Sequence, residues 1–197
     1  RNGGLSAMHS IDLLGTVLAA LFERSGVDPS LVGQVVGGCV GQVGMQTMNV
    51  ARNAWLTIGK DYTAGGTTLD NQCGSAQTAN HMISSMIATG SVNIGIAAGV
   101  EAMSRVGLGA NVYNGPGSSK PDNFPSDMPD QFGAAERIAQ NRGITRDDVD
   151  WLGAESQRKA AQAWAEGRFD REVAPIEVPV LGEDGQPTGE KQVISKD

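Results

Sequence analysis

Apolar residues recur every three or four positions in several segments of the chain, and this spacing predicts amphipathic helices. The first such segment is Ser10–Ser25, with Gly26 placed to end the helix. Comparable spacing predicts further helices over Thr47–Ile58, Gly74–Thr89, Gln131–Asn141 and Thr145–Glu166. Short runs between turn residues predict strands over Gln34–Val40, Thr67–Leu69 and Asn93–Val100.

Strands and helices alternate up to Arg105, and this order predicts a layered α/β domain with a mostly parallel sheet over residues 1–105. The next stretch, 106–129, is rich in Gly, Pro, Asn, Ser and Asp and shows little periodicity. Two helices follow, and then a predicted hairpin over Val173–Val180 and Glu190–Ile194. Residues 106–197 are therefore predicted to form an appended α+β subdomain.

The second helix of this subdomain has a recognisable start. Thr145 and Asp148 form a capping box in which Asp replaces the usual Glu. The acidic side chains of Asp147, Asp148 and Asp150 suit the positive end of the helix dipole and need no metal. Trp151 and Trp164 lie on the same helix, where we expect core positions.

Composition narrows the choice of partners and compartment. The net charge is −7 and no Lys/Arg cluster occurs, so nucleic acid is not expected as a partner. No apolar run approaches the length of about 18 residues that a membrane helix needs, and we expect no membrane association. Two cysteines form no disulfide framework, which favours a reducing compartment and a cytoplasmic protein.

One of the cysteines lies in the segment LDNQCGSAQTANHM, between a predicted strand and a predicted helix. Cys73 is thus predicted at a strand-to-helix elbow, where the positive end of the helix dipole favours a thiolate nucleophile. Gly74 allows a sharp turn, and the Cys73 N–H can serve as one donor of an oxyanion hole. The alternative is a buried, inert thiol, because free cysteines are among the most buried residues. The local pattern leaves both readings open.

No base for Cys73 is visible in the pattern. The chain has two histidines, His9 and His81. His81 lies eight positions further along the predicted helix, which is roughly 12 Å along its axis, too far for a hydrogen bond. We expect His9 to be a loop or capping residue before the first helix. No metal-ligand spacing occurs either.

The glycine-rich segment GGCVGQVG has the spacing G-x-x-G-x-x-G, at Gly37, Gly38, Gly41 and Gly44. Dinucleotide-binding loops have G-x-G-x-x-G and an acidic residue about 20 positions later, which this chain lacks. These glycines are interpreted as sites of close packing between a strand end and a loop.

The motifs together resemble those of the thiolases. The nucleophile segment is Asn71-Gln-Cys73-Gly-Ser-Ala, and a family step after the next strand is matched by Ala98-Gly-Val-Glu101-Ala-Met-Ser104. Four later segments resemble the thiolase loop domain: Ala135-Glu136-Arg-Ile-Ala, Gly143-Ile-Thr-Arg146-Asp-Asp, Glu155-Ser156-Gln-Arg-Lys-Ala-Ala and Gly167-Arg-Phe169-Asp-Arg-Glu172-Val-Ala-Pro175. The motifs occur in the family order and cover essentially the whole chain.

The resemblance implies a layered fold, αβαβα in the complete protein, of which residues 1–105 form an incomplete N-terminal half and 106–197 the loop domain on the CoA-binding side. It implies an acetyl-CoA C-acyltransferase or acetyltransferase of lipid metabolism, β-oxidation included. In this reaction Cys73 takes the acyl group of a 3-ketoacyl-CoA, or an acetyl group in the biosynthetic direction. Acyl-CoA and CoA would be its substrates, with no metal or separate cofactor. The family also suggests a homodimer or homotetramer, with Thr67–Leu69 near the subunit contact.

The same resemblance accounts for the missing base. The activating histidine, a second acid/base cysteine and an oxyanion-hole asparagine are expected in a C-terminal domain. A first strand is expected before Arg1. This chain is therefore predicted to be inactive by itself.

The chain departs from the family at one place near the expected CoA pocket. Where thiolases often have His-Met-Gly or Met-Gly, this chain has Asp130-Gln131-Phe132-Gly133. Gln131 and Phe132 are the candidate CoA-binding residues, and acyl specificity is left open. Two other functions are also left open: a non-catalytic thiolase-like lipid carrier, and a ketoacyl synthase that condenses on a carrier protein.

Overall fold

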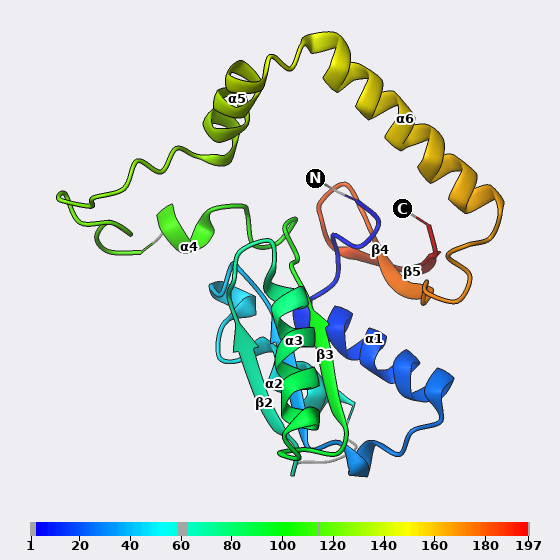
Figure 1. Ribbon diagram of the computed structural model, residues 1–197. Helices are drawn as coiled ribbons and strands as arrows, with labels where there is room; N and C mark the ends of the chain where they lie inside the picture. Colours follow the sequence, from blue (N-terminus) through cyan, green and yellow to red (C-terminus); the bar gives the residue numbers. More distant parts are fainter. Residues whose placement is uncertain (1–2, 59–62, 114, 197) are drawn as a thin grey trace. The chain divides into compact units, whose positions relative to one another are not determined.

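The computed structural model describes residues 3–58, 63–113 and 115–196. Contacts within the chain define two compact units, one formed by Arg1–Gly117 with Ala174–Asp197 and the other by Ser118–Val173 (Figure 1). The division predicted from sequence, with one domain over residues 1–105 and another over 106–197, stays a prediction. Among the described residues, none of the helices combines the length and apolar character needed to cross a lipid bilayer.

A three-stranded parallel sheet organises the first unit. Its strands are β1 (Gln34–Gly38), β2 (Gly65–Leu69) and β3 (Gly95–Gly99), in the order β2-β1-β3. In this register Gly38 lies opposite Leu69 on one side and Gly99 on the other. The carboxyl ends of all three strands therefore meet at one edge, and the segments that follow them are neighbours.

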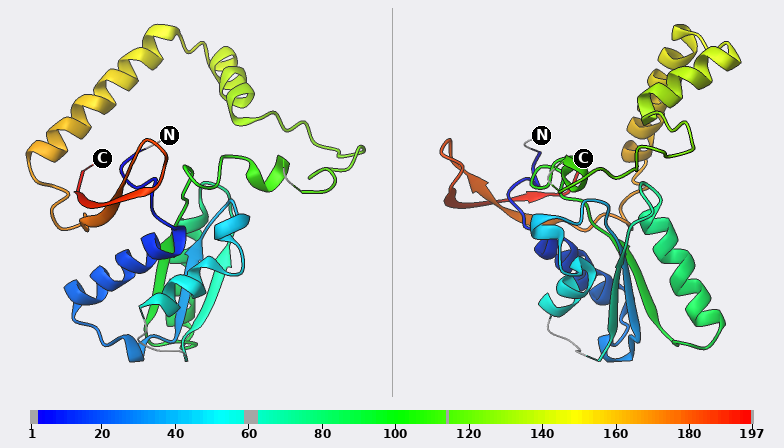
Figure 2. Two further views of the ribbon diagram at one scale, coloured as in Figure 1. Left: turned by 180° about the vertical axis from the view of Figure 1, so that it is seen from behind. Right: turned by 90° about the vertical axis from the view of Figure 1, so that its left-hand side faces the viewer.

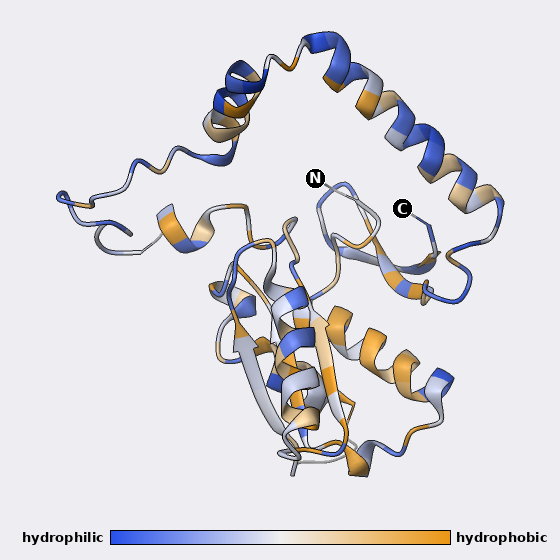
Figure 3. Ribbon diagram, in the orientation of Figure 1, coloured by the Kyte–Doolittle hydropathy of each residue, from blue (hydrophilic) through white to orange (hydrophobic). Residues whose placement is uncertain are grey.

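Helices cover both faces of this sheet. They are α1 (Ser10–Ser25), α2 (Val50–Thr57) and α3 (Ser75–Ala88). Figure 2 shows α3 on one face and α1 with α2 on the other. Neighbouring strand residues point to opposite faces, so Val35 packs with Leu18 and Trp55, whereas Val36 packs with Ala79 beneath α3. Figure 3 shows that most of α1 is hydrophobic, as a helix packed on this core requires.

The predicted helix over Ser10–Ser25 is confirmed to the residue. Gly26 ends it in the left-handed conformation at φ 67°, and His9 begins it by accepting a hydrogen bond from the Ile11 N–H at Nδ1. The helix predicted over 47–58 begins later, at Val50. Asn49 is left-handed at φ 64°, and its side-chain oxygen accepts from the Arg52 N–H as the N-cap, so the α-helix cannot extend back through Asn49.

Short elements connect these helices and strands. They are the 3-10 helices η1 (Pro29–Leu31) and η2 (Gly44–Gln46) and the single turn α4 (Ala110–Tyr113). The predicted hairpin is confirmed as β4 (Ile176–Leu181) paired antiparallel with β5 (Pro187–Ile194). Its second strand begins three residues earlier than predicted.

The hairpin is packed at two places. Val178 on β4 is fully buried, and Gly4 near the N-terminus lies directly against the side chain of Ile194 on β5.

The second unit contains α5 (Gln131–Arg142) and α6 (Arg146–Ala165). Neither helix has a buried residue, so both rely on local interactions. The predicted capping box is confirmed, because Thr145 and Asp148 exchange side-chain-to-backbone hydrogen bonds. Hydrogen bonds from the Thr145 backbone and hydroxyl hold the pKa of Asp148 below its usual value.

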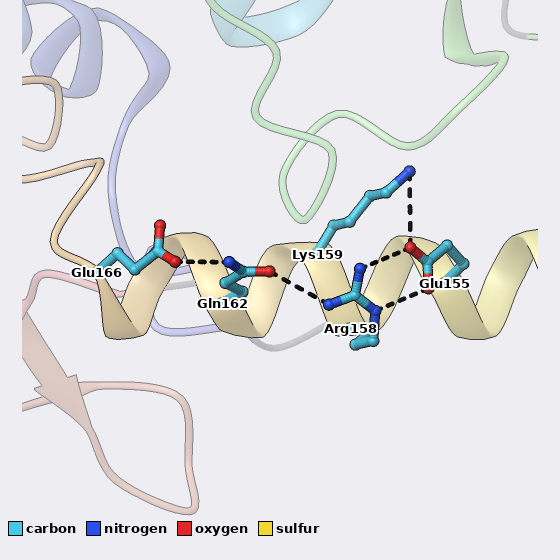
Figure 4. Close-up of polar contacts among 5 residues, drawn as sticks. All are labelled: Glu155, Arg158, Lys159, Gln162 and Glu166. Atoms are coloured by element: carbon cyan, nitrogen blue, oxygen red, sulfur yellow. Dashed lines mark hydrogen bonds and ion pairs between the residues drawn. The ribbon is translucent and has the colours of Figure 1, made fainter.

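Side chains three and four positions apart form a polar ladder along α6, shown in Figure 4. Arg158 binds both carboxylate oxygens of Glu155 and also donates to Gln162, which donates in turn to Glu166. The core position expected for Trp151 is wrong, since this side chain is largely exposed. Trp164 packs against the ring of Phe169, with centroids 5.0 Å apart.

Replacing Gly38 with alanine tests the contact between sheet and helix. A Cβ at Gly38 would lie 2.5 Å from the Ala76 nitrogen and 2.6 Å from the Ser75 carbonyl carbon, both of them backbone atoms. We expect Gly38→Ala to lower the free energy of unfolding by about 1–3 kcal/mol in urea titrations. Gly107→Ala is the control, because no atom lies within 4 Å of its added Cβ. Equal stability of the two variants would contradict this account of the packing.

Candidate active site

The predicted strand-to-helix elbow around Cys73 is confirmed. Strand β2 ends at Leu69, and α3 begins at Ser75 with Gly74 as its N-cap residue. Cys73 lies between them and is exposed. The segment therefore presents a thiol at the amino end of a 14-residue helix, next to the carboxyl edge of the sheet.

The turn before the cysteine is strained. Gln72 adopts a left-handed φ of 49°, which is uncommon for a residue with a side chain. Such a conformation costs about 1–3 kcal/mol and persists only where its surroundings enforce it. One enforcing contact is the Asp70 carboxylate, which accepts a hydrogen bond of 2.7 Å from the Gln72 N–H. The Gly74 N–H donates to the Asn71 carbonyl at 3.1 Å and closes the turn.

The hydroxyl group of Ser75 joins both sides of this turn. It accepts a hydrogen bond from the Asn71 N–H at 2.9 Å and donates to the Gln72 carbonyl at 2.5 Å. The Asn71 side chain in turn donates to the Thr78 hydroxyl at 2.7 Å. In the described part of the chain, no backbone hydrogen bond donated by the Cys73 N–H is found outside the helices and strands. Its predicted use as an oxyanion donor stays a prediction.

The other cysteine has the opposite surroundings. Cys39 follows β1 directly and is only 1% exposed. Burial raises the pKa of its thiol from 9.0 to about 12, and the negative charges of Glu101 and Asp70 and a hydrogen bond to Glu101 act in the same direction. Cys39 is therefore a neutral thiol at physiological pH. The alternative considered for Cys73, a buried and inert thiol, applies to Cys39 instead.

A carboxylate ties the loop after β1 to the loop after β3. Glu101 accepts hydrogen bonds from the Val40 N–H at 2.8 Å and the Gly41 N–H at 3.1 Å. The fully buried Gln46 also donates to Glu101 at 2.8 Å, and its side-chain oxygen accepts from the Ala102 N–H at 2.7 Å. In the sequence, Glu101 was recognised as part of a motif but was assigned no role. Gln46 was missed, because a single neutral glutamine belongs to no recognisable motif.

Three of the four glycines in the glycine-rich segment pack closely, but Gly37 and Gly38 do so against helices and only Gly41 against a loop. A Cβ at Gly37 would lie 2.6 Å from the Cβ of Ala51 on α2. At Gly41 an added Cβ would lie 2.8 Å from the Glu101 carboxylate. Gly44 is not closely packed, since no atom lies within 4 Å of an added Cβ. Glycine is favoured there by its left-handed φ of 55°.

Neither histidine is placed to activate Cys73 through a hydrogen bond. His9 caps α1, and His81 is exposed on α3. Within 3–58, 63–113 and 115–196 no group of three or more His, Cys, Asp or Glu side chains could hold a metal ion.

The candidate CoA residues lie in the other unit, at the first two positions of α5. The Phe132 N–H donates a hydrogen bond of 2.8 Å to the Asp130 carboxylate, and the Phe132 side chain is exposed. Binding of CoA by Gln131 and Phe132 stays a prediction.

Fold and site together define an α/β protein with a candidate nucleophilic cysteine at the carboxyl edge of a parallel sheet. A family model described as "Thiolase, N-terminal domain" matches residues 1–197. The chain therefore belongs to the thiolase family, and the resemblance read from its motifs is confirmed. Its parallel sheet and flanking helices are those of a partial thiolase N-terminal domain.

Curated relatives support the same assignment. The 3-ketoacyl-CoA thiolase of Psychrobacter cryohalolentis is 37% identical over 177 residues, which cover 90% of this chain and 45% of the relative. The steroid 3-ketoacyl-CoA thiolase FadA6 of Mycobacterium tuberculosis is 30% identical over 187 residues, which cover 90% of this chain and 46% of the relative. The chain thus spans about half the length of the curated relatives it matches.

Alkylation distinguishes the two thiols. At about pH 8, iodoacetamide should label the exposed Cys73 and leave the buried, protonated Cys39 unmodified, because only an accessible thiolate reacts. Peptide mass spectrometry should find one labelled site in the native chain and both in denaturant. Labelling of Cys39 at the same rate as Cys73 in the native chain would contradict the burial described here.

The raised pKa of Cys39 also predicts a pH dependence of stability. Above pH 9 the unfolded chain releases this proton while the folded chain retains it until about pH 12. The stabilising contribution is complete below pH 9 and is lost as pH rises, by at most about 1.4 kcal/mol per pH unit. Urea titrations from about pH 8 to about pH 10 should show a steeper loss for the wild type than for Cys39→Ala. Parallel curves would contradict the shift.

Proposed function

We propose that this chain forms the nucleophile-bearing part of a thiolase-type acyltransferase that acts on 3-ketoacyl-CoA. The observation that carries the proposal is the contrast between its two cysteines. Cys73 is exposed at the amino end of α3, inside the family's nucleophile motif, whereas Cys39 is buried with a raised pKa. A cysteine nucleophile must be accessible to its substrate, and of the two cysteines only Cys73 is exposed.

In the degradative direction, the Cys73 thiolate attacks the C3 carbonyl of the 3-ketoacyl-CoA. The carbonyl oxygen becomes an oxyanion, and the Cys73 N–H is one of its donors. The C2–C3 bond then breaks, its electron pair leaves with the acetyl-CoA enolate, and that carbon takes up a proton. The acyl group stays on Cys73 as a thioester.

The second half of the reaction regenerates the enzyme. The CoA thiolate attacks the carbonyl carbon of the acyl-cysteine, and the Cys73 thiolate leaves. A thiolate suits both steps because it is a good nucleophile and, in a thioester, a good leaving group. The reverse sequence is a Claisen condensation that begins with acetylation of Cys73 by acetyl-CoA.

The groups that move protons in this scheme are expected in the thiolase C-terminal domain. They are a histidine that activates Cys73 and a second cysteine that acts as acid and base. An asparagine is also expected there, and it would donate a hydrogen bond in an oxyanion hole without transferring a proton. The described residues contribute the nucleophile, its elbow and the Cys73 N–H.

Incubation of the full-length protein with acetyl-CoA tests the proposal. Intact-mass and peptide spectra should show one acetyl group, on Cys73. Cys73→Ala should abolish the adduct, and Cys39→Ala is the matched control that should retain it.

Each alternative function predicts another result. A non-catalytic lipid carrier would bind acyl-CoA without any adduct on Cys73. A ketoacyl synthase would be acylated by an acyl carrier protein in preference to acyl-CoA. An adduct that survives Cys73→Ala would overturn the assignment of the nucleophile.

A further inference from the structure

We infer that Ser75 is a positioning residue for acyl transfer and that it orients the Cys73 N–H through the preceding peptide group. The inference rests on the proposed function of Cys73. Ser75 opens α3 two residues after the nucleophile, and only 5% of it is exposed. It touches no reacting atom in the proposed scheme, so any role in catalysis is exerted through its neighbours.

The hydrogen bonds of Ser75 converge on one peptide group. Its hydroxyl donates to the Gln72 carbonyl oxygen at 2.5 Å, and its own N–H donates to the same oxygen at 3.0 Å. That oxygen belongs to the peptide group that ends in the Cys73 N–H. In a planar trans peptide the C=O and N–H bonds point in opposite directions. Holding the Gln72 oxygen beside the helix therefore aims the Cys73 N–H away from it.

The same hydroxyl also accepts the Asn71 N–H at 2.9 Å, so it restrains the chain on both sides of Gln72. Gln72 is the residue held in the left-handed region at φ 49°. Without this hydroxyl, the Asn71 N–H loses its partner and Gln72 loses one of the contacts that hold it in the left-handed region. Either change rotates the Gln72–Cys73 peptide group and moves the oxyanion donor.

The position of Ser75 is itself set by the sheet. A Cβ on Gly38 would lie 2.8 Å from the Ser75 Cβ, which shows how closely the end of β1 approaches this residue. Ser75 thus transmits the position of the sheet edge to the peptide group before the nucleophile. A small side chain with one donor and one acceptor meets this requirement, and alanine lacks both groups.

The test is the acetylation of Cys73 by acetyl-CoA in the full-length protein, followed over a range of acetyl-CoA concentrations. Ser75→Ala should lower the maximal rate constant by about tenfold or more, because a misdirected oxyanion donor stabilises the transition state less. The half-saturating acetyl-CoA concentration should change little, since the donor acts mainly in the transition state. Ser75→Thr, which retains a hydroxyl group, should restore most of the rate.

Ser85→Ala is the matched control. It removes a hydroxyl group from the same helix. Among the described residues, this hydroxyl donates only to a helical carbonyl, that of His81 at 2.8 Å. Its rate constant should equal that of the wild type. All rates are measured on samples shown by circular dichroism to be folded, so a loss of stability alone does not lower them.

The outcomes separate this inference from the proposed function. A wild-type protein that forms no adduct on Cys73 overturns both. A normal adduct together with a wild-type rate constant in Ser75→Ala overturns only the positioning role. If Ser75→Ala does not fold, Ser75→Cys replaces the hydroxyl with a weaker donor and should give an intermediate rate. A wild-type rate constant in Ser75→Cys then overturns the inference.

Discussion

The contact between the end of β1 and the start of α3 is the constraint on which the candidate site depends. Gly38 brings the strand so close to Ala76 and Ser75 that even one methyl group would collide with the helix backbone. Because the strands are parallel and Gly38 lies opposite Leu69, this contact also limits where the chain can turn between β2 and α3. The elbow fits within that limit through a strained Gln72 and the hydrogen bonds of Ser75.

Two thiols near the same sheet edge have different chemistry for physical reasons. Cys39 continues β1 into the packed interior, where burial and the nearby carboxylates disfavour its charged form. The elbow carries Cys73 outward to the amino end of α3, where its side chain is exposed. Glu101 acts in two ways. It fixes the loop after β1 through hydrogen bonds, and its negative charge helps to raise the pKa of Cys39.

The second unit follows another rule. Its two helices bury no residue, and their stability comes from caps and from side-chain pairs at helical spacing. Thr145 and Asp148 begin α6, and the ladder from Glu155 to Glu166 runs along it. Such exposed pairs contribute little individually, because solvent and salt screen their charges. This unit therefore depends on local sequence to a degree that the sheet and its helices do not.

Local features were readable from the sequence alone: the first helix with His9 and Gly26 at its ends, the capping box of α6 and the elbow at Cys73. Each depends on residues a few positions apart, and so does each single motif that indicated the thiolase family. Tertiary structure alone decided that Gln46 and Glu101 meet and that Cys39 is the neutral thiol. The bonds of Ser75 across the strained turn are local, but they were visible only in the structure. The sequence pattern also did not predict the exposure of Trp151. The contacts of Glu101 depend on strand register and helix packing, which bring together groups 55 and 61 residues apart and which no local pattern encodes.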